Sequence, residues 1–169
     1  MIIKGTRFGT ISFDENRIIT IAKGLVGFSS ETRFVFLEPP PGRTVAWLQS
    51  VDTPDLAFPV LAGEAFGANY PTPGAVELGR RAQLSTPGAT ASNFTTLVVV
   101  ASRGVPSQRI ANLLAPIVVN VDTRCGAQIV LDPEMYSAAT PFELETPTIP
   151  APAPQHLLSQ VSHAESVSP

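Results

Sequence analysis

The sequence predicts an all-β fold, a barrel or a closed sandwich built from short strands. Its 169 residues include 17 prolines and 12 glycines, which interrupt long helices, and apolar residues make up 44% of the chain, enough for one buried core. Short apolar runs bounded by turn residues recur along the chain, as is typical of strands in such folds. The length fits one folded domain, and we find no repeat of fixed period.

Five strands are predicted in the first 62 residues. In the first run, aromatic and branched residues alternate with small or polar ones, and the third run is aromatic and β-branched until it stops at three consecutive prolines. The last two runs flank a short acidic turn, residues 52–55, with the sequence Asp-Thr-Pro-Asp. Pro59 cannot donate a backbone hydrogen bond, so its run is expected at a sheet edge or beside a bulge. The five runs are 6–13, 16–22, 33–38, 44–50 and 56–62.

The second part of the chain predicts one helix and three further strands. Residues 75–84 form the one convincing helical candidate, and the uniformly apolar run 95–102 is expected to be a strand buried on both faces. The runs 116–121 and 127–132 are separated by a loop that contains Gly126, which predicts a hairpin. Altogether we expect seven to nine strands.

The C-terminal segment differs from the rest of the chain. Residues 145–155 alternate proline with small residues, which favours extended chain over packed structure. We therefore expect a folded domain over residues 1–144 and a disordered Pro/Ala-rich tail over residues 145–169. The alternative is a short docking motif formed by the apolar residues Leu157, Leu158 and Val161.

Charge and composition argue against nucleic acids and membranes as partners. The net charge of −3 divides into +2 for residues 1–131 and −5 for residues 132–169, so the body carries no excess of Lys and Arg for binding RNA or DNA. The longest apolar stretch, residues 110–121, falls short of the ~20 residues that span a bilayer. Cys125 is the single cysteine, and the N-terminus does not resemble a signal peptide. We expect a soluble, cytoplasmic protein.

The sequence offers few groups for catalysis. Both histidines lie in the predicted tail, so the body has no imidazole to act as a general base or metal ligand. Cys125 lacks a histidine partner there, and the aspartates of the acidic turn are accounted for as turn-forming residues. We expect no enzyme activity, no cofactor and no metal site.

One region has the composition of a protein-binding surface. Residues 44–79 contain four acidic residues and no Lys or Arg, with aromatic residues interleaved among them. Acidic groups around aromatic anchors suit a basic protein partner, because the charges steer association while the aromatic rings contribute affinity. The alternative is that the aromatic residues are ordinary core residues and the acids are solvated. Composition alone indicates a β-rich binding module.

Four segments resemble the FliW family of flagellar assembly factors. Residues 48–60, LQSVDTPDLAFPV, are similar to the hallmark segment of that family, with its acidic Asp/Pro turn. Residues 8–28 resemble the N-terminal strand pair followed by Gly-Leu-x-Gly-Phe, and residues 33–38 resemble the next strand. Residues 111–131, ANLLAPIVVNVDTRCGAQIVL, resemble the family's Ala-Asn-Leu-x-Ala-Pro-Ile-Val-x-Asn hairpin. The four segments follow the family's order and spacing.

This resemblance implies a small, mostly antiparallel β-barrel-like domain with a short helical segment and no catalysis. Family members bind flagellin and CsrA, a small dimeric RNA-binding repressor of flagellin mRNA translation. FliW bound to CsrA relieves repression by an allosteric effect, and flagellin sequesters FliW so that repression returns. The resemblance also implies a monomeric protein that does not itself bind nucleic acid.

The resemblance assigns roles to individual residues of this chain. The expected partner-binding residues are Asp52, Asp55, Leu56 and Phe58 in the hallmark segment, with Asn112 and Asn120 in the hairpin segment as weaker candidates. The residues expected to hold turns are Gly24, Gly27, Pro54 and Pro116.

Two alternatives to this function stay open from the sequence. One is a flagellin-specific chaperone that does not antagonise CsrA. The other is a small-molecule-binding or hydrolytic β-barrel, which would need an enclosed pocket with convergent polar groups.

Overall fold

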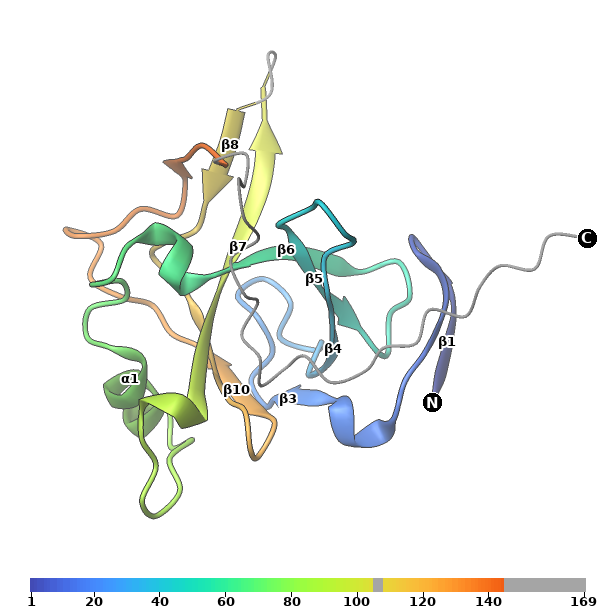
Figure 1. The fold of residues 1–169 in the computed structure, drawn as a ribbon, viewed down its shortest axis with the longest axis horizontal. Coiled ribbons are helices and arrows are strands. Elements are labelled where there is room, and N and C mark those ends of the chain that lie inside the picture. Colours follow the sequence, from blue (N-terminus) through green and yellow to red (C-terminus); the bar gives the residue numbers. More distant parts are fainter. Residues whose placement is uncertain (105–107, 145–169) are drawn as a thin grey trace, which may run out of the picture.

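The computed structural model describes residues 1–104 and 108–144, so the tail predicted over residues 145–169 lies outside the described residues. Strands dominate this part of the chain, with one short α-helix, α1 (Ala75–Arg81), as Figure 1 shows. The strands are β1 (Ile2–Thr6), β2 (Gly9–Ser12), β3 (Ile19–Ile21), β4 (Arg33–Leu37), β5 (Ala46–Ser50), β6 (Ala57–Ala62), β7 (Phe94–Arg103), β8 (Gln108–Ala111), β9 (Ile117–Asn120), β10 (Cys125–Gln128) and β11 (Thr140–Pro141). Single turns of 3-10 helix form η1 (Glu15–Arg17), η2 (Gly63–Phe66) and η3 (Ala91–Asn93).

Seven of these strands close into a barrel. The order is β3-β4-β5-β6-β7-β9-β10, and β10 pairs with β3 to close the ring. All neighbouring pairs in the ring are antiparallel except β3 and β10, which are parallel. The expected all-β, mostly antiparallel and barrel-like fold is therefore confirmed.

The alternation of side chains along the strands builds the core. Residues that point inward from β3, β4, β5, β6, β7 and β9 form one buried cluster, joined by Leu25 from the loop after β3 and by Val121 directly after β9. Phe34 of β4, Leu48 of β5 and Ile117 of β9 have no exposed surface. The members of the cluster are Ile19, Ile21, Leu25, Phe34, Phe36, Ala46, Leu48, Val60, Leu97, Ile117, Val119 and Val121.

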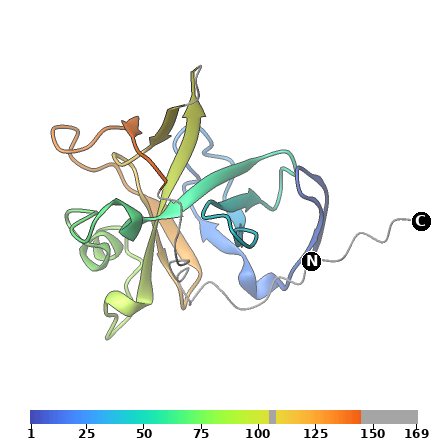
Figure 2. The same ribbon diagram turned by 45° about the horizontal axis from the view of Figure 1, so that its top comes forward.

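Two elements cover the outside of the barrel on opposite sides (Figure 1 and Figure 2). The β1–β2 hairpin packs Ile3 and Ile11 against Val35 on the outer face of β4. On the other side, α1 packs Leu78 against Phe94 of β7. A fourth buried cluster forms where β7 extends past β6 to pair with β8.

The structure differs from the sequence prediction at several element boundaries. The single strand predicted over residues 6–13 is wrong, because the chain turns at residues 7–8 between β1 and β2. Gly5 and Gly9 have positive φ angles of 76° and 84°, a backbone conformation that other residues rarely adopt, and these glycines flank the turn. The predicted strand over 16–22 shortens to β3, preceded by η1, and the strands β1, β8 and β11 were not predicted.

Pro59 lies where its missing N–H group does least harm. It pairs with Trp47 of β5, while pairing between β6 and β7 begins only at the next residue, Val60. This part of β6 is therefore bonded on one side only, as expected for a strand proline.

Among the described residues, no helix is long and apolar enough to cross a membrane.

Candidate partner-binding surface

The acidic turn, residues 52–55, connects β5 to β6. The two strands pair from Ala46 opposite Val60 to Gln49 opposite Ala57. Beyond the last strand pair, the Ser50 amide donates a hydrogen bond of 2.9 Å to the carbonyl oxygen of Leu56. The turn therefore projects from the β5–β6 hairpin. Both strands of this hairpin belong to the barrel wall, which holds the ends of the turn in place.

The side chain of Gln49 hydrogen-bonds to the backbone of this turn. Its side chain has no exposed surface, and its Nε2 donates to the carbonyl oxygens of Ser50, Pro54 and Leu56 at 2.9, 3.0 and 3.0 Å. A buried carbonyl without a donor is costly, so this amide stabilises the path of the chain around the turn. Sequence reasoning missed Gln49, although a glutamine inside an apolar strand was a visible signal.

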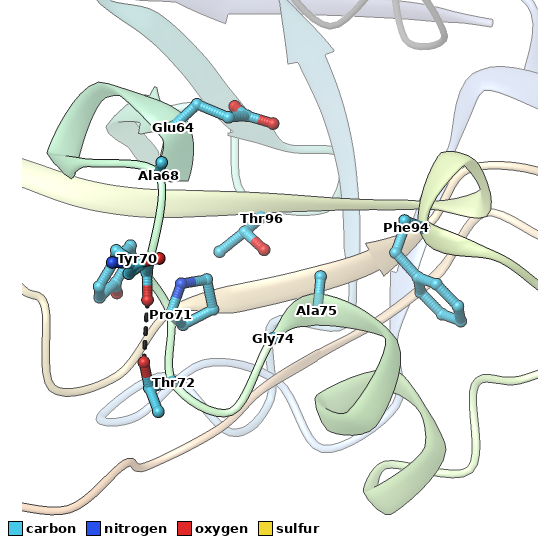
Figure 3. Close-up of a pocket in the computed structure, with 12 residues that line it drawn as sticks. Glu64, Ala68, Tyr70, Pro71, Thr72, Gly74, Ala75, Phe94 and Thr96 are labelled. Atoms are coloured by element: carbon cyan, nitrogen blue, oxygen red, sulfur yellow. Dashed lines mark hydrogen bonds between the residues drawn. The ribbon is translucent and has the colours of Figure 1, made fainter.

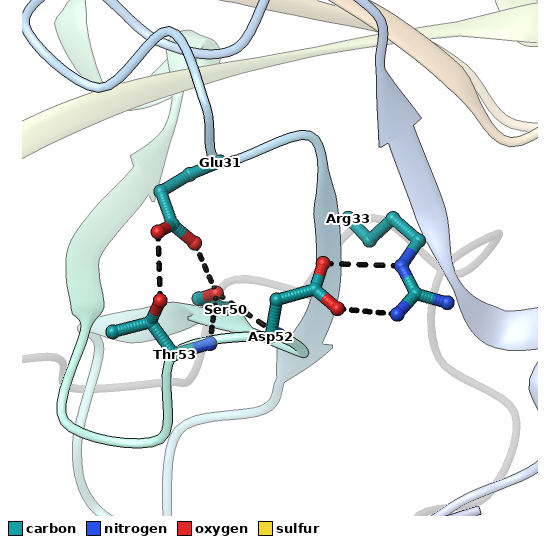
Figure 4. A network of polar contacts seen from close by, with 5 residues as sticks. All are labelled: Glu31, Arg33, Ser50, Asp52 and Thr53. Carbon is teal, nitrogen blue, oxygen red and sulfur yellow. Dashed lines mark hydrogen bonds and ion pairs between the residues drawn. The ribbon is translucent and has the colours of Figure 1, made fainter.

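Hydroxyl groups fix the turn from the side (Figure 4). Ser50 Oγ accepts hydrogen bonds from the amides of Asp52 and Thr53 at 3.2 and 2.9 Å, and donates to Glu31 Oε2 at 2.6 Å. Thr53 Oγ1 donates to the other carboxylate oxygen of Glu31 at 2.7 Å. The carboxylate of Glu31 therefore holds two side chains of the turn segment.

Asp52 is engaged by a cation. Its carboxylate accepts two hydrogen bonds from the guanidinium of Arg33, the first residue of β4, with Arg33 Nε 3.1 Å from Asp52 Oδ2 (Figure 4). These bonds hold the pKa of Asp52 below its ordinary value and raise the pKa of Arg33. Both side chains remain exposed to solvent.

Asp55 differs from Asp52 in this respect. Its side chain is exposed and makes no ion pair or hydrogen bond to any residue in the described ranges. We expected both aspartates of the turn to be available to a partner. Since Arg33 neutralises Asp52, the free negative charge of the turn comes from Asp55.

An apolar patch adjoins the acidic turn. Phe58 is half-buried and packs edge-to-face against Phe28, with ring centroids 5.0 Å apart, and against Phe34 at 6.2 Å. Phe28 and Val26 are 40% and 68% exposed. We call Val26, Phe28 and Phe58 the apolar patch. Exposed aromatic rings are frequent anchors of protein interfaces, and Phe58 follows Asp55 of the acidic turn along the same hairpin.

Gly24 makes the loop beside this patch possible. Its φ angle is +64°, and a Cβ atom built there would lie 2.4 Å from the carbonyl oxygen of Phe28. Gly27 has a φ angle of +83°, but a Cβ atom there would meet nothing within 4 Å. Both glycines stand where turns require them, and Gly24 has the stricter requirement.

The two prolines expected to hold turns have different surroundings. Pro54 is half-buried, and its carbonyl oxygen accepts from Gln49. Pro116 is buried directly before β9, and its carbonyl oxygen accepts a bond of 3.0 Å from the Ile129 amide.

The asparagines of the hairpin segment serve the fold. Asn120 has no exposed surface; its Nδ2 donates to the Leu84 carbonyl at 2.7 Å, and its Oδ1 accepts from the amides of Asp122 and Thr123. We therefore withdraw Asn120 as a residue that touches a partner, because no part of its side chain reaches the surface. Asn112 is half-buried, and its Oδ1 accepts from the Ala115 amide at 3.1 Å.

Within residues 1–104 and 108–144, the structure brings together no group of three or more His, Cys, Asp or Glu side chains that could hold a metal ion. In the acidic turn and its supports, Arg33 pairs with Asp52, Glu31 is bonded to Ser50 and Thr53, and Asp55 is left without a partner among the described residues. An unpaired carboxylate in a segment that also carries part of the apolar patch suits binding of a basic protein.

Known proteins resemble this chain over most of its length. The family model described as FliW protein matches residues 2–142. The flagellar assembly factor FliW of Magnetococcus marinus is 38% identical over 130 residues, covering 77% of this chain and 78% of that protein. The FliW of Geobacter sulfurreducens is 33% identical over 164 residues, covering 97% of this chain and all of that protein. The FliW of Bdellovibrio bacteriovorus is 32% identical over 142 residues, covering 84% and 79% of the two chains.

A solved structure has the same fold. The crystal structure of the flagellar assembly factor FliW superposes with a TM-score of 0.69 at 26% sequence identity, covering 83% of this chain and 96% of that one. The barrel, the family match over nearly all of the described residues and these relatives lead to one conclusion. The chain belongs to the FliW family of flagellar assembly factors.

Proposed function

We propose that this flagellar assembly factor acts in the cytoplasm by binding two proteins in turn, the translational regulator CsrA and flagellin. Bound to CsrA, it relieves the repression of flagellin mRNA. Newly made flagellin then binds the factor and returns CsrA to its RNA. The observation that carries this proposal is the acidic turn, which hydrogen bonds hold in place and which presents the unpaired Asp55 carboxylate in the segment that leads to Phe58 of the apolar patch.

The rigidity of the turn favours a protein partner. Gln49, Ser50 and Glu31 fix the backbone before any partner arrives, so little conformational entropy is lost on binding. The Asp55 charge would steer a basic partner such as CsrA toward the surface, and the apolar patch would supply contact area. Leu56 and Phe58 are half-buried and contribute the base of this surface.

Antagonism of CsrA requires no RNA-binding surface on this chain. The residues up to 131 carry a balance of only +2, which does not provide the cationic stripe that competes for RNA phosphates. The factor would therefore lower RNA affinity by changing CsrA itself. Such a linkage corresponds to a coupling free energy of ~1–3 kcal/mol.

One observation favours a second candidate, a flagellin chaperone that does not antagonise CsrA. Arg33 neutralises Asp52, so the turn carries less free charge for steering CsrA than its sequence suggests. Flagellin binding through an apolar surface would be unaffected by this ion pair.

A pull-down from flagellated cells tests the proposal. The tagged chain is used as bait and eluted at low and then high salt, and the eluates are read by mass spectrometry. We expect CsrA in the salt eluate and flagellin retained on the bait. The variant Asp55→Lys should lose CsrA, while Glu134→Lys, which reverses an exposed charge on the loop after β10, should keep both partners.

Other outcomes of the pull-down decide between the partner switch and the flagellin chaperone. Flagellin without CsrA, from the wild-type bait in cells that contain both, would support the chaperone and contradict the partner switch. Recovery of neither protein would contradict both.

A further inference from the structure

A second surface lies at the other end of β6. The acidic turn precedes this strand and η2 follows it, and the six residues of β6 separate the two by about 20 Å. Beyond η2, the chain borders a cavity of about 670 Å³ (Figure 3). Its walls are η2, the loop of residues 67–74, the start of α1 and the first residues of β7.

Thr96 places a free hydroxyl group in this cavity. The residue is only 5% exposed and lines the cavity, yet its hydroxyl makes no hydrogen bond to any residue that the structure describes. Its Cβ and methyl group face Gly63, where an added Cβ would meet them at 3.0 and 3.1 Å. The hydroxyl is therefore left to point into the cavity, as Figure 3 shows. Because it has no partner among the described residues, this hydroxyl can bond to a ligand group or to water.

Glu64 supplies the charge at the mouth of the cavity. It is exposed, and its carboxylate forms no ion pair or hydrogen bond within the described part of the chain. None of the described residues that line the cavity is Lys or Arg. The cavity is therefore complementary to a positive charge.

Apolar surfaces form the remaining walls. The rings of Tyr70 and Phe94 and the side chains of Pro71 and Ala75 line the cavity (Figure 3). Tyr70 is fixed, because its hydroxyl donates to the Leu113 carbonyl at 3.0 Å. Burial raises the pKa of Tyr70 well above its ordinary range, so this hydroxyl stays protonated and keeps donating.

We propose that this cavity binds a lysine or arginine side chain of a partner polypeptide, at a site separate from the acidic turn. The cationic end would pair with Glu64, the methylene stem would lie on the rings, and the partner's main chain would bond the Thr96 hydroxyl. Half of the lining residues are exposed, so the cavity does not enclose a free small molecule, whereas a polypeptide adds contacts around the rim.

An NMR titration of the whole chain tests the proposal. The probe is Nα-acetyl-lysine N-methylamide, and its uncharged counterpart with norleucine and the free diamine cadaverine are titrated in parallel. We expect the lysine probe to bind in the millimolar range and to shift the amide resonances of Glu64, Tyr70, Ala75 and Thr96. The norleucine and cadaverine probes should bind more weakly.

Three variants sharpen the titration. Glu64→Gln should weaken binding of the lysine probe roughly fivefold. Thr96→Val should weaken it roughly threefold without lowering the melting temperature, because the hydroxyl that it removes has no partner in the fold. Asp55→Asn, which removes an unpaired carboxylate at the other end of β6, should leave binding unchanged.

Several results would overturn the proposal. If the norleucine probe bound as tightly as the lysine probe, the positive charge would play no part in binding. If cadaverine bound as tightly as the lysine probe, the peptide groups would play no part. Unchanged binding in Glu64→Gln, or shifts confined to the acidic turn, would place the probe elsewhere. None of these results depends on whether CsrA or flagellin binds.

Discussion

The two ends of β6 are stabilised in different ways. At the acidic turn, polar side chains hold the chain: Gln49 Nε2 and Ser50 Oγ bond to its backbone, and Glu31 accepts from the hydroxyls of Ser50 and Thr53. At the cavity end, aromatic rings do this work, with Phe66 packed edge-to-face against Tyr70 at 6.1 Å and Phe142 at 5.5 Å.

This difference decides which groups are left for binding. At the acidic turn, most polar groups are bonded to the turn and few are available to a partner. What remains for binding is chiefly the Asp55 carboxylate and the apolar patch. Where rings shape the chain, the polar groups of Glu64 and Thr96 stay unpaired within the described residues and face the cavity or its mouth. The number of charges in a segment is therefore a poor guide to its binding capacity.

The largest expected effect on stability concerns the loop beside the apolar patch. Gly24→Ala should lower the free energy of unfolding by about 3 kcal/mol, because the φ angle is positive and the new Cβ would overlap the Phe28 carbonyl oxygen at 2.4 Å. Gly27→Ala, with a positive φ angle and no neighbour within 4 Å, should cost only about 1 kcal/mol. Urea denaturation measures both, and equal losses would show that crowding at Gly24 is relieved by movement of the loop.

The second-largest expected loss of stability follows from removing an aromatic ring at the cavity end of β6. Phe66→Ala should cost about 2–3 kcal/mol, since it deletes two ring contacts of a half-buried side chain and opens a void beside Tyr70. Phe8→Ala, which removes a 40% exposed ring from the surface of Trp47, should cost less than about 1 kcal/mol. A loss at Phe66 no larger than that at Phe8 would contradict the assignment of rings as the support of this end.

Gln49→Leu should cost about 1–2 kcal/mol, because the carbonyl oxygens of Ser50 and Pro54 lose the Gln49 amide, while that of Leu56 keeps its bond from the Ser50 amide. Glu64→Gln at the other end should change stability by less than about 0.5 kcal/mol, since its carboxylate has no partner to lose. Thermal unfolding of both variants separates the two ends: a stable Gln49→Leu protein would mean that the turn does not need its polar support.

The fold was largely predictable from the sequence, and the reasons are local. Strands β4 to β7 and β9 are apolar runs bounded by prolines, glycines and acidic turns. The hairpin was predicted, but its second strand was placed too late: β10 is Cys125–Gln128 and includes Gly126, where the prediction had a loop and a strand over 127–132. Strand β1 was missed because its five residues, Ile-Ile-Lys-Gly-Thr, are short and contain a charge and a glycine. Strand β11 has two residues and is set by its pairing with β8.

The site was predictable only in part, because its contacts cross the sheet. The acidic turn was found from its residue types. The ion pair between Asp52 and Arg33 depends on β4 lying antiparallel to β5, which brings the start of one strand beside the end of the other. Thr96 and Glu64 come together through the pairing of β6 with β7, which no local pattern reports.

The smallest expected effect on stability concerns this ion pair. Because Arg33 lowers the pKa of Asp52, the pair contributes stability above the ordinary pKa of 3.8, and this contribution is lost as the pH falls through the lower pKa of the folded protein. Both groups are exposed, so Asp52→Asn should cost less than about 0.5 kcal/mol at neutral pH. Urea denaturation at several pH values should show this difference disappearing in acid, and a difference that grows in acid would contradict the assignment.

The most direct test of the central claim is the association rate of CsrA with the purified chain, measured at about 50 mM and about 300 mM salt. If the free carboxylate of the acidic turn steers CsrA, Asp55→Lys should lower the rate about tenfold at low salt and much less at high salt, while Glu134→Lys should stay close to wild type. A wild-type rate for Asp55→Lys, or the same loss in both variants, would contradict the claim that CsrA binds at the acidic turn.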